Sequence, residues 1–191
     1  MFKLYTEQKP TFSFHDYAML MAEVKQLGAK SALEIGPGIS TLALIESGLE
    51  RIVTLEHDDE WFAVAVEKFK DYPQVTVGRY VDDPVATGDI VGVFDVAFVD
   101  SPKGFHRPIP GIRGVRKVHP GQEDCSRLNT CLLALKHAPV VYLHDATRPL
   151  ERGTLGRLNA MGHTIEHLPG AMARITRHGQ NAARTDLQGA A

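Results

Sequence analysis

The sequence has 191 residues, a length that suits one domain with a full hydrophobic core and is short for two. Its 43% hydrophobic and 23% charged residues are typical of a globular protein, and a formal net charge of −2 gives no overall attraction to nucleic acid or anionic membranes. No apolar run approaches the ~20 residues that cross a bilayer, and Lys3, Glu7 and Lys9 interrupt the amino-terminal segment. These features predict a cytoplasmic protein that is not bound to a membrane.

Apolar periodicity and turn residues predict helices and strands that alternate along the chain. Ser13 and Asp16 have the spacing of a capping box, which predicts a helix that ends near Leu27. The predicted strands are about 31–36, 51–56, 75–81, 93–100, 140–145, 163–168 and 171–177. The predicted helices between them are about 40–47, from Asp58 or Asp59 to Phe69, around 125–135, and from Pro149. The last two strands form a hairpin around Pro169-Gly170, so the final strand is expected to run antiparallel.

A strand that leads into a tight glycine turn is the most informative feature of the sequence. The strand carries Glu34, and Gly36-Pro37-Gly38 then turns the chain into a helix that opens at Ser40. Glycines at such a turn let the backbone bend sharply and let a flat ligand lie against it. The pattern is typical of a nucleotide-binding α/β unit, although Thr41 replaces the third glycine of the dinucleotide fingerprint.

Acidic side chains are predicted at the carboxyl ends of successive strands, where the ligand of a parallel sheet lies. Glu56 ends the second strand, and a carboxylate in this place accepts hydrogen bonds from both hydroxyls of a ribose. Asp82, next to Asp83, follows the third strand, and Asp100 and His144-Asp145 follow the fourth and fifth. We therefore expect these side chains to share one ligand-binding edge.

The acid-x-Gly-x-Gly motif, together with Glu56, resembles class I S-adenosylmethionine-dependent methyltransferases. The resemblance implies an α/β fold with a single Rossmann-like domain, a seven-stranded mostly parallel sheet with an antiparallel last strand, and helices on both faces. It implies S-adenosylmethionine as cofactor, with the methionine part near Glu34 and the glycine turn, and the ribose at Glu56. The cofactor-binding residues that it implies are Glu34, Gly36, Pro37, Gly38, Ser40, Glu56, His57 and Asp82.

Asp100, His144 and Asp145 are the candidate catalytic residues. Methyl transfer to a hydroxyl needs an aligned acceptor and a group that removes its proton. Asp100 and Asp145 either bind a divalent cation, which lowers the pKa of the acceptor, or one of them or His144 acts directly as the base. A catechol-type metal site has an Asn directly after the second Asp, where this chain has Ala146. His144 or His106 would then have to complete the metal site.

Three motifs further along the chain resemble the glucuronoxylan 4-O-methyltransferase family. They are Asp-x-Pro-x-Gly at 100–104, a Pro-Gly-x arginine loop at 110–113, and His-Asp-x-x-Arg-x-x-Glu at 144–151. The resemblance implies O-methyl transfer to a hydroxyl of a carbohydrate. Arg148 and Glu151 lie one helical turn apart in the last motif, and they either pair to brace the turn or contact the substrate.

The segment 101–121 is strongly basic and contains no acid. Guanidinium groups bind carboxylates in a bidentate manner, and loops of this length are commonly lids. We therefore expect a lid that binds an anionic acceptor, with a solvated basic loop as the alternative. Nucleic acid is not expected as the acceptor, because one basic loop on an acidic chain is a small footprint. The predicted substrate-binding residues are Lys103, His106, Arg107, Arg113, Arg116 and Arg148.

The sequence thus predicts three parts: residues 1–30, an amino-terminal extension and helix that cover the cofactor site; residues 31–178, a methyltransferase domain with the basic lid; and residues 179–191, a polar tail. The predicted function is S-adenosylmethionine-dependent O-methylation of a small or carbohydrate acceptor that is anionic. One alternative is an NAD(P)-dependent Rossmann oxidoreductase, against which Glu34 and the missing third glycine count. The other is a non-catalytic nucleoside-binding protein, which would not need Asp100 and Asp145.

Overall fold

The structure of the chain is a computed structural model that describes residues 12–80, 92–100 and 127–179. Its helices are α2 (Phe14–Gln26), α3 (Ile39–Glu46), α4 (Asp59–Phe69), α5 (Leu128–His137) and α6 (Pro149–Ala160). Its strands are β1 (Ser31–Ile35), β2 (Arg51–Glu56), β3 (Val75–Arg79), β4 (Val96–Val99), β5 (Val140–Leu143), β6 (Thr164–His167) and β7 (Ala173–Thr176). The predicted strands and helices in the described ranges are all present, with bounds that match or differ by a few residues.

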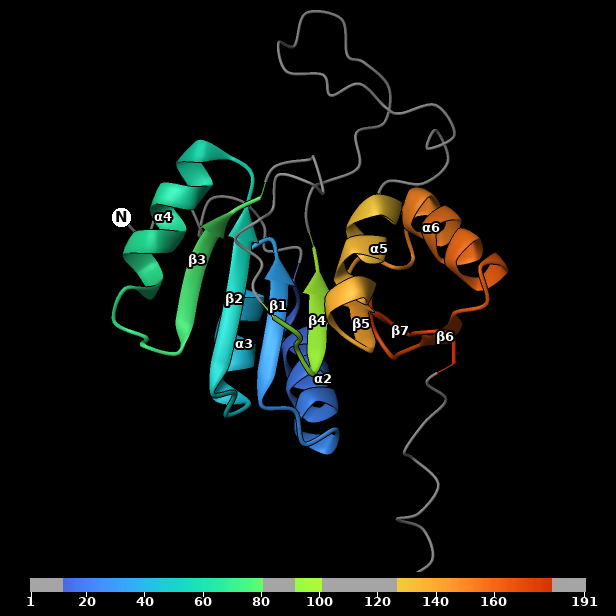
Figure 1. Cartoon of the computed structure of the whole chain (residues 1–191), viewed down its shortest axis with the longest axis horizontal. Helices are drawn as coiled ribbons and strands as arrows, with labels where there is room; N and C mark the ends of the chain where they lie inside the picture. Colours follow the sequence, from blue (N-terminus) through green and yellow to red (C-terminus); the bar gives the residue numbers. More distant parts are fainter. Residues whose placement is uncertain (1–11, 81–91, 101–126, 180–191) are drawn as a thin grey trace, which may run out of the picture.

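The strands form one seven-stranded sheet in the order β3-β2-β1-β4-β5-β7-β6 (Figure 1). Strands β1 to β5 pair in parallel, whereas β7 pairs antiparallel with both β5 and β6. The strand order reverses between β1 and β4, and at such a switch point the loops on either side diverge and leave room for a ligand. The predicted Rossmann-like sheet with an antiparallel last strand is confirmed.

Two apolar layers cover the opposite faces of the sheet. On one face, Leu20 and Val24 of α2 and Leu44 of α3 pack with Phe98 and Tyr142. On the other face α5 and α6 pack against the sheet, and this layer includes Cys131, Ala134, Leu155, Leu158, Leu33, Val99 and Val141. Alternation along each strand sends successive side chains to the two layers, and this double burial explains the continuous apolar runs of β4 and β5. The predicted placement of helices on both faces is therefore confirmed.

Strand β4 begins later than the sequence indicated, at Val96 instead of Val93. The side chain of Asp95 accepts hydrogen bonds from the backbone N–H groups of Lys30 (2.8 Å) and Ser31 (2.9 Å) at the start of β1. Val93 is 75% exposed and lies outside the sheet. The contacts of Asp95 with the start of β1 thus mark the point where β4 begins to pair. Apolar periodicity alone does not predict this point.

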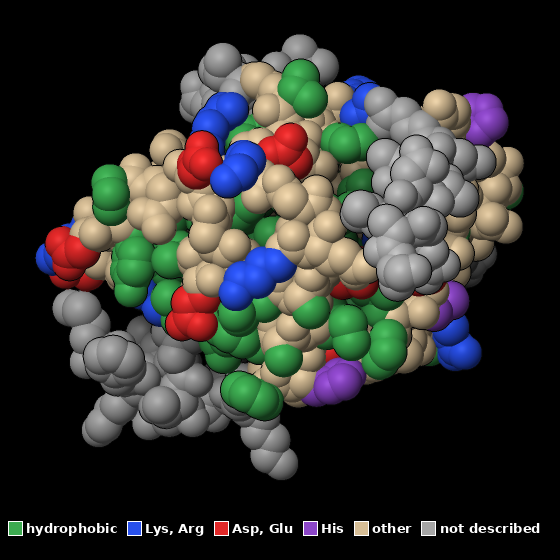
Figure 2. All heavy atoms as spheres, turned by 90° about the horizontal axis from the view of Figure 1, so that it is seen from below, with side chains coloured by type: hydrophobic (Ala, Val, Ile, Leu, Met, Phe, Trp, Pro, Cys, Tyr) green, Lys and Arg blue, Asp and Glu red, His purple; other side chains and the backbone are tan. Residues whose placement is uncertain are grey.

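The end of the molecule where the parallel strands begin carries charges of both signs. Figure 2 views the molecule from below and shows basic and acidic side chains interspersed among apolar ones. Lys30 and Glu50, which precede β1 and β2, form an exposed ion pair of 3.1 Å there. In the part of the chain that the structure describes, no helix is long and apolar enough to cross a membrane.

Candidate functional site

The sheet places the candidate residues at one edge by continuing its hydrogen bonds past the strand ends. The N–H of Asp100 donates to the carbonyl of Ile35 (2.9 Å), and the N–H of His144 donates to the carbonyl of Val99 (3.0 Å). Gly36 donates to the carbonyl of Leu55 (2.9 Å) in the same way. The first residue after each of β1, β4 and β5 is therefore fixed by its neighbour, and this rigidity suits a site that must hold precise geometry.

Glu34 is tied to the first turn of α3. It is fully buried, and its Oε1 and Oε2 accept hydrogen bonds from the hydroxyls of Ser40 (2.6 Å) and Thr41 (2.7 Å). Thr41 Oγ1 in turn accepts a hydrogen bond from the N–H of Gly38 (2.9 Å). The carboxylate thus braces the glycine turn, in which Gly36 has a φ of 99° that favours glycine. Its contact with a bound methionine group remains a prediction.

Burial raises the pKa of Glu34 to about 7, although the bonds from Ser40 and Thr41 oppose this change. A carboxyl group without water around it holds its proton more tightly, because the charged form loses its solvation. The group therefore changes protonation near neutral pH. The negative charge expected beside the glycine turn is only partly present under these conditions.

Glu56 lies at the end of β2, and its two carboxylate oxygens differ in their contacts. The backbone N–H groups of His57 (2.6 Å) and Asp58 (2.9 Å) both donate to Oε1, and His57 Nδ1 lies 2.8 Å from the same atom. Oε2 receives none of these three contacts. A buried carboxylate with one fixed oxygen and one that remains available suits the recognition of ribose hydroxyls.

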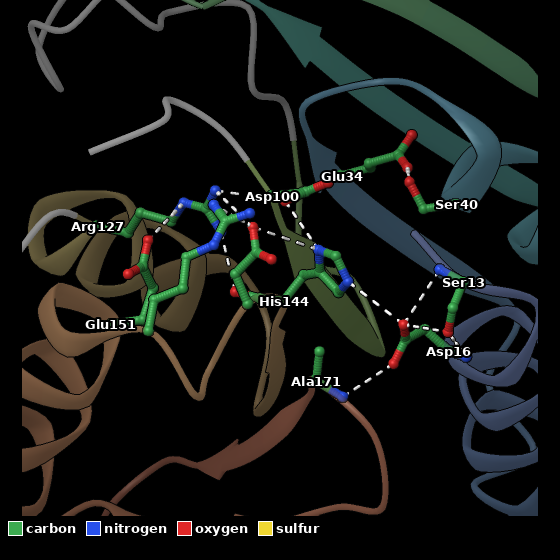
Figure 3. A network of polar contacts seen from close by, with 11 residues as sticks. Ser13, Asp16, Glu34, Ser40, Asp100, Arg127, His144, Glu151 and Ala171 are labelled. Atoms are coloured by element: carbon green, nitrogen blue, oxygen red, sulfur yellow. Dashed lines mark hydrogen bonds and ion pairs between the residues drawn. The ribbon is translucent and has the colours of Figure 1, made fainter. Parts of the chain in front are cut away.

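His144 lies between two carboxylates that come from distant parts of the chain (Figure 3). Its Nδ1 is 3.1 Å from Asp100 Oδ1, and its Nε2 is 3.7 Å from Asp16 Oδ2. The ring is fully buried and packs against Phe12, with ring centroids 4.9 Å apart. The described part of the amino-terminal segment therefore covers His144, although whether it covers a cofactor stays a prediction.

Arg127 lies at the centre of a second group of contacts. Its side chain is fully buried, and Nη2 lies 3.3 Å from Asp100 Oδ1 and 3.6 Å from Asp145 Oδ2. Nη1 donates to the carbonyl of His144 (2.9 Å), and Nε lies 3.8 Å from Glu151 Oε1. One guanidinium group thus contacts strand ends β4 and β5 and the first turn of α6 (Figure 3).

Arg148 pairs with Asp145, whereas the sequence offered Glu151 as its structural partner. Arg148 Nη1 lies 2.6 Å from Asp145 Oδ2, and Glu151 faces Arg127 instead. Asp145 has a φ of 59°, in the left-handed region that a residue with a Cβ rarely adopts. An ion pair of Arg148 therefore does stabilise the turn, but its partner is Asp145 and not Glu151.

The pKa directions separate the three candidate catalytic groups. Burial raises the pKa of Asp100, but the hydrogen bond from His144 and the charges of Arg127, His144 and Arg148 outweigh it, so this pKa lies below its usual value. Burial lowers the pKa of His144, but Asp100, Asp145 and Asp16 outweigh it, so this pKa lies above its usual value. Burial raises the pKa of Asp145, against the opposing charges of His144 and Arg127.

These environments favour Asp100 as the group that meets an acceptor. Its side chain is 24% exposed, compared with 9% for Asp145 and 0% for His144. An ionised and partly exposed carboxylate is able to receive a proton from a bound hydroxyl. His144 is enclosed and its raised pKa favours the protonated form, and both features argue against its direct use as the base.

Asp100, His144 and Asp145 have the side-chain chemistry of a metal site, with one ligand atom of each within 4.8 Å of the others. One oxygen of each carboxylate, however, already faces a cation: Asp100 Oδ1 faces Arg127, and Asp145 Oδ2 faces both Arg127 and Arg148. A divalent ion would have to displace these groups, because cations repel each other by several kcal/mol at about 4 Å in a protein environment. The residues therefore do not fit a divalent metal as arranged.

Six of the predicted site residues lie outside the described residues: Asp82, Lys103, His106, Arg107, Arg113 and Arg116. Their roles remain predictions. The structure adds Arg127 and Asp16, which the motif analysis did not place in the site. Asp16 was identified only as a helix cap, and a lone Arg before a helix is usually exposed, so neither gave a local signal.

The fold is shared with solved O-methyltransferases. An O-methyltransferase from Streptomyces achromogenes, solved with S-adenosylmethionine, superposes with a TM-score of 0.62 at 17% identity over 87% of this chain and 81% of that one. One from Bacillus cereus, solved with S-adenosylhomocysteine, has a TM-score of 0.60 at 19% identity over 86% and 82% of the two chains. A putative RNA methyltransferase from Pyrococcus horikoshii also has a TM-score of 0.60, at 14% identity over 87% and 83%.

At these identities the comparison establishes the fold alone. The chain has the Rossmann-like methyltransferase fold with its seven-stranded sheet. No family model and no curated protein matches the sequence. The resemblance to the sugar methyltransferases therefore rests on the three motifs and stays a prediction.

Proposed function

We propose that the chain is an S-adenosylmethionine-dependent O-methyltransferase that acts on a hydroxyl of a small or carbohydrate acceptor with a negative charge. The observation that carries this proposal is the alignment of the glycine turn, Glu56 and Asp100 along one edge of the methyltransferase-like sheet. Glu56 has an oxygen available for a ribose, and Asp100 is the ionised carboxylate of the switch point. The proposed base, Asp100, would therefore lie next to the proposed cofactor site.

The chain's own residues bind, orient and accept a proton in this reaction. The backbone of Gly36 to Gly38 and Glu56 would hold the cofactor. When bound, it would supply a methyl group to the acceptor oxygen, and the electron pair of the broken carbon–sulfur bond would stay on sulfur. Asp100 takes the hydroxyl proton, so the charges of the products balance.

The negative charge of the proposed acceptor is supported by the sequence, and the carbohydrate by the three motifs described above. The segment 101–121 contains Lys103, Arg107, Arg113, Arg116 and Lys117 without any acid, directly after Asp100. Planar guanidinium groups bind carboxylates and phosphates through paired hydrogen bonds. Arg148 belongs to the same set of predicted substrate-binding residues, and its side chain is 38% exposed beside Asp145.

Calorimetry with S-adenosylmethionine, S-adenosylhomocysteine and NAD tests the cofactor. Binding of the first two and not of NAD is expected, and tight binding of NAD alone would move the chain to the oxidoreductases. A screen of uronic acids, phosphosugars and neutral phenols with a labelled methyl donor then tests the acceptor. Transfer only to neutral phenols would contradict the anionic acceptor, and binding without any transfer would favour a nucleoside-binding protein.

A further inference from the structure

Arg127 occupies the point where carboxylates from three segments of the chain meet. These are Asp100 after β4, Asp145 after β5 and Glu151 in the first turn of α6, at 3.3, 3.6 and 3.8 Å from guanidinium nitrogens. The remaining terminal nitrogen donates to the carbonyl of His144 at 2.9 Å. The side chain is fully buried, so this set of partners is fixed by the fold and not by solvent.

The carboxylates that face Arg127 are also the groups that a divalent cation would use. Asp100, His144 and Asp145 each offer one ligand atom, and these atoms lie within 4.8 Å of one another. Hard divalent cations bind carboxylate oxygens at about 2.0–2.6 Å, and the guanidinium group already lies against one oxygen of Asp100 and one of Asp145. A metal ion between these carboxylates would lie beside a buried positive charge, so we expect Arg127 and a bridging metal to exclude each other.

We propose that Arg127 is the resident cation of this site, a positioning residue that holds Asp100 and Asp145 in the place of a divalent metal, so that the reaction needs no added metal ion. The inference rests on the proposed O-methyltransferase function for its catalytic part. Its binding part, the exclusion of a metal by Arg127, does not depend on turnover.

The two kinds of cation have different chemical consequences. A metal coordinates the acceptor oxygen and lowers its pKa, but a fully buried guanidinium group does not reach the acceptor. Arg127 acts through Asp100 instead, and both Arg127 and His144 contact its Oδ1, which leaves Oδ2 to receive the proton. The low pKa of Asp100 keeps it ionised at neutral pH and makes it a weak base. Such a base suits a hydroxyl that loses its proton as the methyl group arrives.

Manganese binding to the whole chain tests the metal exclusion without any assay of turnover. We expect electron paramagnetic resonance to show no stoichiometric Mn²⁺ binding to the wild type tighter than about 1 mM, the weak end of protein cation sites. Arg127→Met should bind Mn²⁺ at least tenfold more tightly, and the added Asp100→Asn change should abolish this gain. Arg157→Met, which removes an exposed arginine of α6, is the matched control and should bind no better than the wild type.

Stoichiometric Mn²⁺ binding by the wild type that Asp100→Asn removes would overturn the inference, and this outcome can be read even if Arg127→Met does not fold. Arg127→Lys provides the second variant, because it keeps one positive charge at the site and should still exclude Mn²⁺. If Arg127→Lys and Arg127→Met both fold and bind Mn²⁺ equally, the charge of the residue is not what excludes the ion, and the inference fails.

Turnover separates a positioning role from a purely structural one. Wild-type methyl transfer should change less than twofold when EDTA is added, and a tenfold loss that Mg²⁺ restores would overturn the inference. In Arg127→Lys, kcat should fall more than tenfold with KM for S-adenosylmethionine within twofold. In Arg127→Met the acid limb of the kcat/KM profile should also move to higher pH, because Asp100 loses the positive charge that lies 3.3 Å from its Oδ1. Absence of any methyl transfer would reject the proposed function and leave the manganese result to stand alone.

Discussion

Asp16 and Ala171, which are 155 residues apart in the sequence, are joined by a hydrogen bond of 3.0 Å from the backbone N–H of Ala171 to Oδ1. The other oxygen, Oδ2, accepts from the N–H (3.2 Å) and hydroxyl (2.6 Å) of Ser13 and faces His144. One carboxylate therefore caps α2, fastens it to the turn between β6 and β7, and contacts the buried histidine of the candidate site. The amino-terminal helix and the site are thus parts of one unit.

Gly170→Ala is expected to weaken this connection. A Cβ at Gly170 would lie 2.6 Å from Asp16 Oδ1, and its φ of +89° is unfavourable for alanine. Gly48→Ala is the matched control, since it has a φ of +84° and nothing within 4 Å of the added Cβ. Both variants lose about 1–2 kcal/mol from the backbone, and Gly170→Ala should lose about 1–3 kcal/mol more because it disturbs a charged hydrogen bond. Urea unfolding measures the difference, and equal losses would show that the Asp16 contact does not stabilise the fold.

Glu34→Gln is expected to alter how stability depends on pH. Burial raises the pKa of Glu34 from 4.5 to about 7, so between these values the folded chain holds a proton that the unfolded chain has lost. Stability of the wild type therefore falls as the pH rises through this window and levels off above about 7. Relative to the wild type, Glu34→Gln should gain about 2–3 kcal/mol between about pH 5 and pH 8.

The measurement for Glu34 is urea unfolding at a series of pH values in the absence of cofactor. Glu50→Gln serves as the control, because Glu50 is an exposed acid in a surface ion pair with Lys30. Its stability relative to the wild type should change little across the same window. A free energy difference for Glu34→Gln that is independent of pH would mean that the buried carboxyl keeps an ordinary pKa.

Sequence reasoning recovered the sheet, its antiparallel end and the residues at the strand ends, because these follow from local periodicity and from the rule that parallel strands end at one edge. Contacts between distant segments were not recoverable in this way. Asp16 has the local signature of a cap, and nothing in that signature indicates Ala171 or His144. The pairing of Arg148 with Asp145 occurs beside a positive φ at Asp145, a conformation that aspartate adopts only occasionally and that the sequence therefore does not predict.

The position of Arg127 in the site could not be predicted from the sequence. Asp100 and Asp145 were visible as strand-end residues and suggested a metal, and Glu151 was visible only as part of a motif. Their neutralising partner comes from a position before α5 that no motif marks. Burial of an arginine is rare without paired acids, so the carboxylates explain Arg127 only once the fold has brought them together.

Glu56→Ala is expected to weaken binding of S-adenosylmethionine by about 1.5–3 kcal/mol, the range for hydrogen bonds to a charged group. The carboxylate is oriented by the N–H groups of His57 and Asp58, so its removal costs the ligand contact and leaves the β2 strand paired. Calorimetry measures the change, and Glu50→Ala is the exposed control. Unchanged affinity in Glu56→Ala would place the ribose elsewhere.

Asp100→Asn is expected to reduce kcat by about 100-fold or more, the usual contribution of a general base, while the affinity for S-adenosylmethionine changes less than about threefold. The amide keeps the size of the side chain but accepts no proton at neutral pH, and it weakens the contact with His144 at 3.1 Å. Asp71→Asn, an exposed change after α4, should leave both constants unchanged. Single-turnover assays with a saturating acceptor separate the chemical step from binding. If Asp100→Asn keeps its turnover while Asp145→Asn loses it, the proton goes to the second carboxylate, and Arg148, 2.6 Å from Asp145 Oδ2, becomes the cation beside the base.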